Sequence, residues 1–103
     1  MQKQSVVIVG GSGMAGGELL RILADHPAME VVGVVSRGKA GHPVAAIHPH
    51  LRPDFPDTLF ITPEQASELD PALVFLALPH GSSAPVIRGC LDRGTRVVDL
   101  AAD

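Results

Sequence analysis

The chain has 103 residues, a formal net charge of −3 and one cysteine. A chain of this length can form a single domain that buries about two-thirds of the surface exposed when it is unfolded. No apolar run approaches the roughly 20 residues that a membrane helix needs, and the N-terminus does not resemble a secretory signal, so we expect a cytoplasmic protein without membrane association. The lone cysteine excludes a disulfide framework and a cysteine-based zinc site. No basic run is present and Tyr and Trp are absent, which argues against nucleic-acid binding.

Strand-like and helix-like segments alternate along the chain. Strands are predicted over residues 5–9, 30–36, 58–61, 72–78 and 95–100. Helices are predicted over residues 14–26, from 62 to near 70, and from 82 or 83 to the glycine at 94. Residues 37–56 are predicted to form a long loop with one helical turn near 44–47. This order predicts an α/β fold: a doubly wound parallel sheet of the Rossmann type, with strand order 3-2-1-4-5 and helices on both faces.

Two helix boundaries carry specific signals. Thr62 is the expected N-cap of the second helix, with Pro63 at its first position and Gln65 closing a capping box. Gly94 stands where a left-handed C-cap is expected for the third helix.

The strongest functional signal is the glycine-rich segment from Gly10 to Gly17, which follows a buried strand and opens a helix. Its glycines fit two spacings used by dinucleotide-binding proteins, Gly11-x-Gly13-x-x-Gly16 and Gly10-x-x-Gly13-x-x-Gly16. Glycine permits a tight turn and lets backbone N–H groups approach a diphosphate beside the positive end of the helix dipole. The alternative is a glycine-rich turn without a ligand. We interpret residues 1–103 as a dinucleotide-binding domain.

The end of the second strand indicates which dinucleotide is bound. An NAD site usually has an acidic residue there, which accepts a hydrogen bond from the ribose 2′-hydroxyl. This chain has Ser36, Arg37 and Lys39 instead. A hydroxyl and a guanidinium favour a 2′-phosphate, so we expect NADP rather than NAD. The alternative is that the two cations are ordinary solvated loop charges.

The turn after the fourth strand is the third candidate region. Ligands of open α/β sheets lie at the carboxyl ends of the strands, so Pro79, His80 and Gly81 are expected to line the nicotinamide side. Alternatively, His80 is a turn histidine that bonds to its own backbone.

Three histidines and an arginine lie in the long loop, and they are His42, His48, His50 and Arg52. Their spacing does not fit a metal site, and no carboxylate or thiol accompanies them, so we expect no metal. Either His48, His50 and Arg52 contact an anionic substrate or another domain, or the loop is solvated. Cys90 lies on the apolar face of a predicted helix and is interpreted as a small buried hydrophobe rather than a nucleophile.

Five segments resemble the N-terminal part of the N-acetyl-gamma-glutamyl-phosphate reductase family, which includes the similar aminoadipate-type reductases of lysine biosynthesis. They are residues 9–21 (VGGSGMAGGELLR), 34–37 (VVSR), 48–52 (HPHLR), 75–81 (FLALPHG) and 97–103 (VVDLAAD). The resemblance covers nearly the whole chain. Its specific parts are the Ala-Leu-Pro-His-Gly turn and the closing Asp-Leu-Ala-Ala-Asp, whereas the glycine loop is common to many families.

The resemblance implies a two-domain, NADP-dependent oxidoreductase of arginine biosynthesis, which reduces an acyl phosphate to the semialdehyde and releases phosphate. A cysteine thiolate of the family forms a thioester, and NADPH delivers hydride. The resemblance assigns cofactor-binding residues to the phosphates (Ser12, Gly13, Met14 and Ala15), to the adenosine ribose phosphate (Ser36 and Arg37) and to the nicotinamide side (Pro79, His80 and Gly81). The glycine spacing adds Gly10 and Gly16 to the expected cofactor-binding residues. The family usually has an aromatic residue where Met14 stands.

The same resemblance places the catalytic cysteine, the catalytic histidine and the substrate domain beyond Asp103. We therefore expect no catalytic residue in this chain and a homo-oligomer for the full-length protein. Two alternatives stay open. One is an enzyme similar to aspartate-semialdehyde dehydrogenase, whose loop after the fourth strand does not normally contain Pro-His-Gly. The other is a stand-alone NADP-binding module without chemistry.

Overall fold

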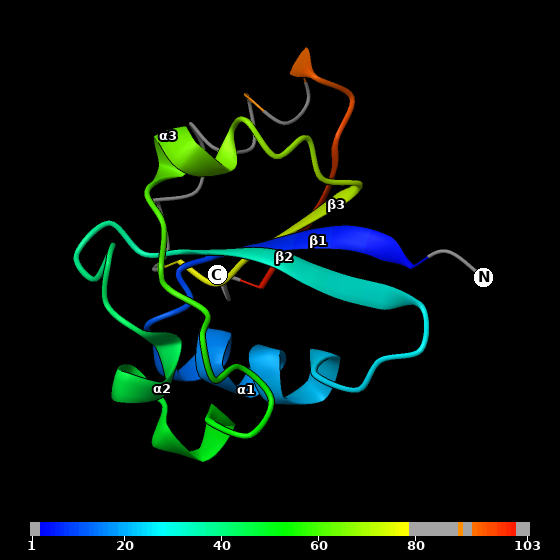
Figure 1. The fold of residues 1–103 in the computed structure, drawn as a ribbon. Coiled ribbons are helices and arrows are strands. Elements are labelled where there is room, and N and C mark those ends of the chain that lie inside the picture. The colour runs from blue at the N-terminus through cyan, green and yellow to red at the C-terminus, as the bar shows by residue number, and fades with distance from the viewer. Residues whose placement is uncertain (1–2, 79–88, 90–91, 101–103) are drawn as a thin grey trace.

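The computed structural model describes residues 3–78, 89 and 92–100. Its sheet contains the parallel strands β1 (Gln4–Val9), β2 (Met29–Val35), β3 (Leu73–Leu76) and β4 (Arg96–Asp99), in the order β2-β1-β3-β4. The helical elements are α1 (Met14–Leu23), α2 (Val44–Ile47), the 3-10 turn η1 (Pro49–Leu51) and α3 (Pro63–Ala66). Helices α1 and α2 cover one face of the sheet and α3 lies over the other (Figure 1). The predicted Rossmann-type α/β fold is confirmed.

Strand β1 explains why the first apolar run needs cover on both faces. Its side chains alternate between the two sides of the sheet, so Val6 and Ile8 enter one hydrophobic cluster while Val7 and Val9 enter the other. All four are buried. Strand β3 pairs with β1 on one side and β4 on the other, which confirms that the most apolar run forms a central strand.

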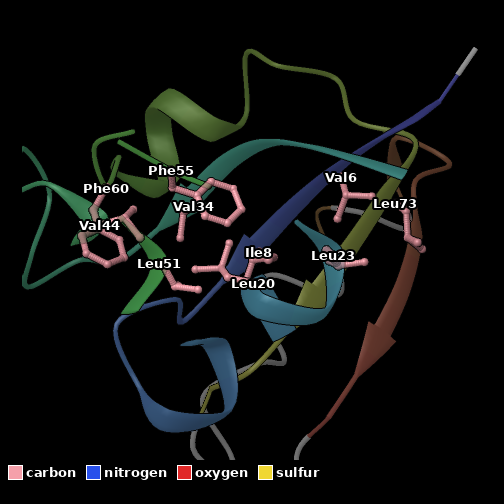
Figure 2. Close-up of a cluster of buried hydrophobic side chains, with 10 residues drawn as sticks. All are labelled: Val6, Ile8, Leu20, Leu23, Val34, Val44, Leu51, Phe55, Phe60 and Leu73. Carbon is pink, nitrogen blue, oxygen red and sulfur yellow. The ribbon is translucent and has the colours of Figure 1, made fainter. Parts of the chain in front are cut away.

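The larger cluster lies between the sheet and the α1–α2 side (Figure 2). It extends from Val6, Leu23 and Leu73 at one end to Val44 and Phe60 at the other, with Leu20 and Ile8 between them. Val44, Leu51 and Phe55 all come from the long predicted loop. This segment is therefore anchored by buried side chains, and the expected helical turn within it is α2.

The predicted third strand, residues 58–61, is not a strand of the sheet. Only Ile61 forms a parallel bridge to β2, at Val35, while Leu59 forms an antiparallel bridge to Pro43. The backbone of Phe60 exchanges hydrogen bonds with the loop, because its N–H donates to the His42 carbonyl and its carbonyl accepts from the Gly41 N–H. The segment meets β2 only at its last residue. In the predicted order 3-2-1-4-5, the position of the third strand is therefore held by a single bridge, and the other four strands form the sheet.

Helix boundaries agree with their predicted signals in two places. The capping box of α3 is present, with the Thr62 hydroxyl accepting from the Gln65 N–H at 3.1 Å and the Gln65 side chain accepting from the Thr62 N–H at 2.8 Å. Gly94 has a φ of +74°, as a left-handed C-cap requires. The rest of the helix predicted from residue 82 or 83 lies almost wholly outside the described residues.

Helix α1 ends three residues before its predicted limit. Its last helical residue is Leu23, and Ala24 is the C-cap, with its N–H bonded to the Leu20 carbonyl. The His26 N–H then bonds to the Leu23 carbonyl, three residues back, so the chain tightens into a turn before Pro27. Across the described part of the chain, no helix is long and apolar enough to cross a membrane.

Candidate functional site

The glycine loop joins the carboxyl end of β1 to the start of α1. Gly10 has a φ of +88°, a conformation that side chains disfavour. The N–H groups of Gly10 and Gly11 both donate to the Val35 carbonyl, at 2.9 and 3.0 Å. The loop is therefore tied to the end of β2 as well as to β1.

Packing explains three of the glycines in this loop. A Cβ at Gly10 would lie 2.6 Å from the Ala77 carbonyl oxygen, and one at Gly11 would lie 2.2 Å from a methyl group of Val34. A Cβ at Gly16 would lie 2.5 Å from the Gly10 carbonyl oxygen. These approaches hold the loop, α1 and the sheet together.

Gly13 is different, because its neighbours leave room for a side chain. The nearest atom to a Cβ there is the Gly10 carbonyl oxygen, at an ordinary contact distance of 3.8 Å. Its φ of −83° and ψ of 175° suit any residue. Nothing inside the described part of the fold requires glycine at this position, which is exposed.

The start of α1 presents free backbone donors to solvent. Gly13 is the N-cap without a side-chain cap, and the first turn contains no acidic residue. The helical ladder starts with the Gly17 N–H donating to the Gly13 carbonyl at 2.9 Å. The Gly13 N–H donates to the Gly10 carbonyl at 3.4 Å. The N–H groups of Met14, Ala15 and Gly16 lack helical acceptors, and they lie at the positive end of the helix dipole. Such an arrangement favours an anion, beside a Met14 side chain that is 93% exposed.

The end of β2 reaches the same loop through two serines. The buried Ser36 hydroxyl donates to the Ser12 hydroxyl at 3.0 Å. Ser12 belongs to the glycine loop, so the predicted phosphate segment and the predicted ribose-phosphate segment are in direct contact. Arg37 follows immediately and is exposed.

The end of β3 lies at the same edge of the sheet. The Ala77 N–H donates to the Val9 carbonyl at 2.8 Å, and the Ala77 carbonyl lies against Gly10. The chain therefore leaves β3 next to the glycine loop. The predicted nicotinamide-side residues Pro79, His80 and Gly81, together with Cys90, lie outside the described residues.

His48 has a position that the sequence analysis did not predict. It is only 8% exposed, and its Nε2 lies 2.7 Å from the Gly11 carbonyl oxygen. The solvated-loop interpretation is therefore wrong for His48, whereas His50 and Arg52 are exposed. The two partners are 37 residues apart, and no local pattern in the sequence indicates this contact.

Other features of the structure lie apart from the loop. Within residues 3–78, 89 and 92–100, no group of three His, Cys, Asp or Glu side chains is placed to hold a metal ion. An apolar groove on the α3 side contains none of the described cofactor candidates. Its lining residues are Val7, Val9, Val35, Pro63, Ala66, Ser67, Pro71, Val74 and Arg93.

One ion pair lies on the exposed side of α1. The Arg21 guanidinium donates to the Glu18 carboxylate. This hydrogen bond lowers the pKa of Glu18 and raises that of Arg21. The negative charge of Glu18 is therefore balanced by an arginine of the same helix.

The comparison with protein families agrees with this geometry. Residues 5–103 match the family described as "Semialdehyde dehydrogenase, NAD binding domain". The chain belongs to this family.

Two curated relatives of this semialdehyde dehydrogenase domain carry the names that the resemblance predicted. A LysW-L-2-aminoadipate/LysW-L-glutamate phosphate reductase of Aeropyrum pernix is 47% identical over 96 residues. An N-acetyl-gamma-glutamyl-phosphate reductase of Methanobrevibacter smithii is 44% identical over 99 residues. The matches cover 93% and 96% of this chain but only 27% and 28% of the relatives. The resemblance to this reductase group is confirmed.

A solved structure supports the fold of the semialdehyde dehydrogenase domain. An aspartate semialdehyde dehydrogenase of Candida albicans, crystallised with NADP, matches with a TM-score of 0.82 and 19% identity. The match covers 97% of this chain and 30% of the other. Both proteins therefore share the α/β arrangement, and the family to which this chain belongs is one of nicotinamide-dinucleotide-binding domains.

Proposed function

We propose that this chain binds NADP(H), with the diphosphate at the glycine loop and the start of α1. The observation that carries the proposal is Gly13, which has room for a side chain but lies at an uncapped helix start. Packing accounts for Gly10, Gly11 and Gly16 without a ligand. A bound diphosphate accounts for Gly13, because a side chain there would keep phosphate oxygens away from the backbone donors.

The residues around the loop fit such a cofactor. Ser12, Gly13, Met14 and Ala15 contact the phosphates, with backbone N–H groups offered by Ser12, Met14 and Ala15, while Gly10 and Gly16 set the loop's shape. Ser36 and Arg37 receive the 2′-phosphate, since Arg37 follows the Ser36–Ser12 contact directly and is exposed. Pro79, His80 and Gly81 line the nicotinamide side, because the chain leaves β3 beside Gly10. Bound NADPH supplies hydride.

We further propose that the whole protein reduces N-acetyl-gamma-glutamyl phosphate, an acyl phosphate, to the semialdehyde in arginine biosynthesis, as a cytoplasmic homo-oligomer. The names of the relatives support an acyl-phosphate reductase. Residues 1–103 would be its dinucleotide-binding domain, and the groups that act on the acyl phosphate would belong to the remaining part of the enzyme.

The substitution Gly13→Val tests the cofactor site. Gly38→Val is the matched control, because a Cβ at Gly38 meets nothing within 4 Å. We expect Gly13→Val to fold and to bind NADPH at least about tenfold more weakly by calorimetry, since one charge-assisted hydrogen bond is worth roughly 1.5–3 kcal/mol. Gly38→Val should retain the affinity of the unmodified chain. Unchanged NADPH affinity in a folded Gly13→Val variant would contradict the assignment.

The substitution Arg37→Glu tests the preference for NADP. The new carboxylate repels a 2′-phosphate, so the ratio of NADPH to NADH affinity should fall by roughly tenfold or more. Arg52→Glu reverses an exposed charge elsewhere in the same loop and should leave the ratio unchanged. Equal ratios in the Arg37→Glu variant and the unmodified chain would remove Arg37 from the cofactor site.

A further inference from the structure

The buried imidazole of His48 links the long loop to the glycine loop. Its backbone is held between α2 and η1, where its N–H donates to the Val44 carbonyl at 2.8 Å and its carbonyl accepts from Leu51 at 2.9 Å. Its ring packs edge-on against Phe60 and His50, with centroid separations of 6.4 and 6.0 Å. The ring is therefore held in one orientation when its Nε2 meets the Gly11 carbonyl.

Helix α1 leaves space for this ring. A Cβ at Gly17 would lie 2.6 Å from Cε1 of His48 and 2.7 Å from its Nδ1. Any larger residue at position 17 would displace the imidazole or the helix. Gly17 is not part of either dinucleotide spacing, so the His48 ring gives a separate reason for glycine at this position.

The hydrogen bond to Gly11 has a consequence for the next N–H group. The Gly11 carbonyl can only accept, so Nε2 of His48 carries the proton. The described part of the chain contains no cis peptide, and in a trans peptide the carbonyl and the N–H point in opposite directions. Because the Gly11 carbonyl points inward to His48, the N–H of Ser12 points away from the core.

We propose that His48 is a positioning residue for the dinucleotide. By holding the Gly11 carbonyl, it directs the Ser12 N–H toward the diphosphate and keeps this donor oriented before the cofactor arrives. The inference rests on the proposed function and deepens it. It makes the long loop a structural support of the phosphate site rather than a solvated connection.

Two variants separate the hydrogen bond from packing. His48→Gln places an amide N–H near the position of Nε2, whereas His48→Met fills similar space without a donor. We expect His48→Met to bind NADPH about tenfold more weakly, and His48→Gln to stay within about threefold of the unmodified chain, since an unpaired buried carbonyl is costly. Adenosine 2′-monophosphate lacks the diphosphate, so its affinity should be the same in all three proteins.

Amide NMR spectra give a direct readout. On addition of NADPH, the Ser12 N–H signal should move strongly downfield in the unmodified chain and in His48→Gln but not in His48→Met. A long-range proton–nitrogen spectrum of the unmodified chain should show the proton on Nε2 of His48, and this measurement needs no variant. A proton on Nδ1 with a bare Nε2 would overturn the proposal even if His48→Met failed to fold.

The outcomes distinguish the two levels of inference. If the unmodified chain does not bind NADPH, the proposed function fails. If it binds NADPH and His48→Met binds equally well, the proposed function stands and the positioning role is wrong. If His48→Met weakens NADPH and adenosine 2′-monophosphate equally, His48 acts through general stability and the positioning role is again wrong.

Discussion

Helices α1 and α3 begin in opposite ways. Thr62 and Gln65 close the start of α3 with two reciprocal hydrogen bonds, and Glu64 adds an acidic group to its first turn. Helix α1 starts at Gly13 with no side-chain cap and no acid in its first turn. Both helices follow a segment at the carboxyl edge of the sheet, where Ile61 bridges to β2 and Val9 ends β1.

The difference separates a helix start that is capped by its own side chains from one that is open to a ligand. At the start of α3, the N–H groups of Thr62 and Gln65 are satisfied within the chain and Pro63 has none, so this end depends less on an external partner. Under the proposed function, the free N–H groups at the start of α1 are left for the cofactor diphosphate, and the dipole of this ten-residue helix favours an anion there. The start of α1 therefore lacks the stability that a side-chain cap would add, and under the proposed function the bound diphosphate supplies it.

The largest expected effect concerns the turn that leads into α1. Gly10 and Gly41 share a φ of +88°, but only Gly10 has an atom within 4 Å of an added Cβ, the nearest being the Ala77 carbonyl oxygen. Gly10→Ala should lower the free energy of unfolding by about 2–4 kcal/mol, and Gly41→Ala by only about 1–2 kcal/mol from the strained φ. Urea denaturation of both variants measures the difference. Equal losses of unfolding free energy in the two variants would mean that the strained φ alone explains the glycine at position 10, without the contact to Ala77.

The second prediction removes the cap of α3. Thr62→Ala should lower the free energy of unfolding by about 1 kcal/mol, because the Gln65 N–H in the first turn loses its acceptor. Thr62→Ser keeps the hydroxyl and should cost much less. Neither variant should alter NADPH affinity, and a loss of affinity in Thr62→Ala would show that the two helix starts are not independent.

The third prediction gives α1 the cap that it lacks. Gly13→Asp should stabilise the apo chain by about 0.5 kcal/mol, because its extended backbone suits an N-cap carboxylate. The same charge should weaken NADPH binding, whereas Gly13→Asn separates the capping hydrogen bond from the charge. Thermal unfolding with and without NADPH measures both effects. If Gly13→Asp is less stable than the unmodified chain in the absence of NADPH, the inference that the start of α1 lacks a cap is wrong.

The smallest expected effect concerns the first acidic group of α1. The hydrogen bond from Arg21 lowers the pKa of Glu18 in the folded chain. The ion pair therefore stabilises the fold at pH values above the pKa of the unfolded chain, near 4.5. This contribution is lost as the pH falls through the lower pKa of the folded chain. Glu18→Gln should therefore reduce stability slightly at neutral pH and not in acid. The pair is exposed, so about 1 M salt should nearly abolish the difference.

Local chemistry explains which predictions from the sequence were confirmed. The capping box of α3 lies within four consecutive residues, and the positive φ of Gly94 depends on its own backbone. The apolar runs of β1 and β3 need cover on both faces wherever they lie. These features depend on neighbouring residues, so reading along the chain was enough to find them.

The third predicted strand failed for a non-local reason. Residues 58–61 carry a strand-like pattern, but Thr58 and Phe60 bond to the loop at 41–44 and only Ile61 bonds toward β2. The loop is anchored in the core by Val44, Leu51 and Phe55. The position of residues 58–60 therefore depends on a packed loop outside the segment, which the strand propensity of the segment does not reveal.

The sequence by itself determined the order of elements, the class of the fold and the presence of a glycine loop suited to phosphate, because hydrophobic period and turn chemistry are local properties. The tertiary structure decided which glycines of this segment are required by packing. A Cβ at Gly10, Gly11 or Gly16 would meet atoms of the segment after β3, of β2 and of the glycine loop, respectively. One at Gly17 would meet His48, and Gly13 alone of these five has room for a side chain. Such distances arise only when segments far apart in the chain are packed together.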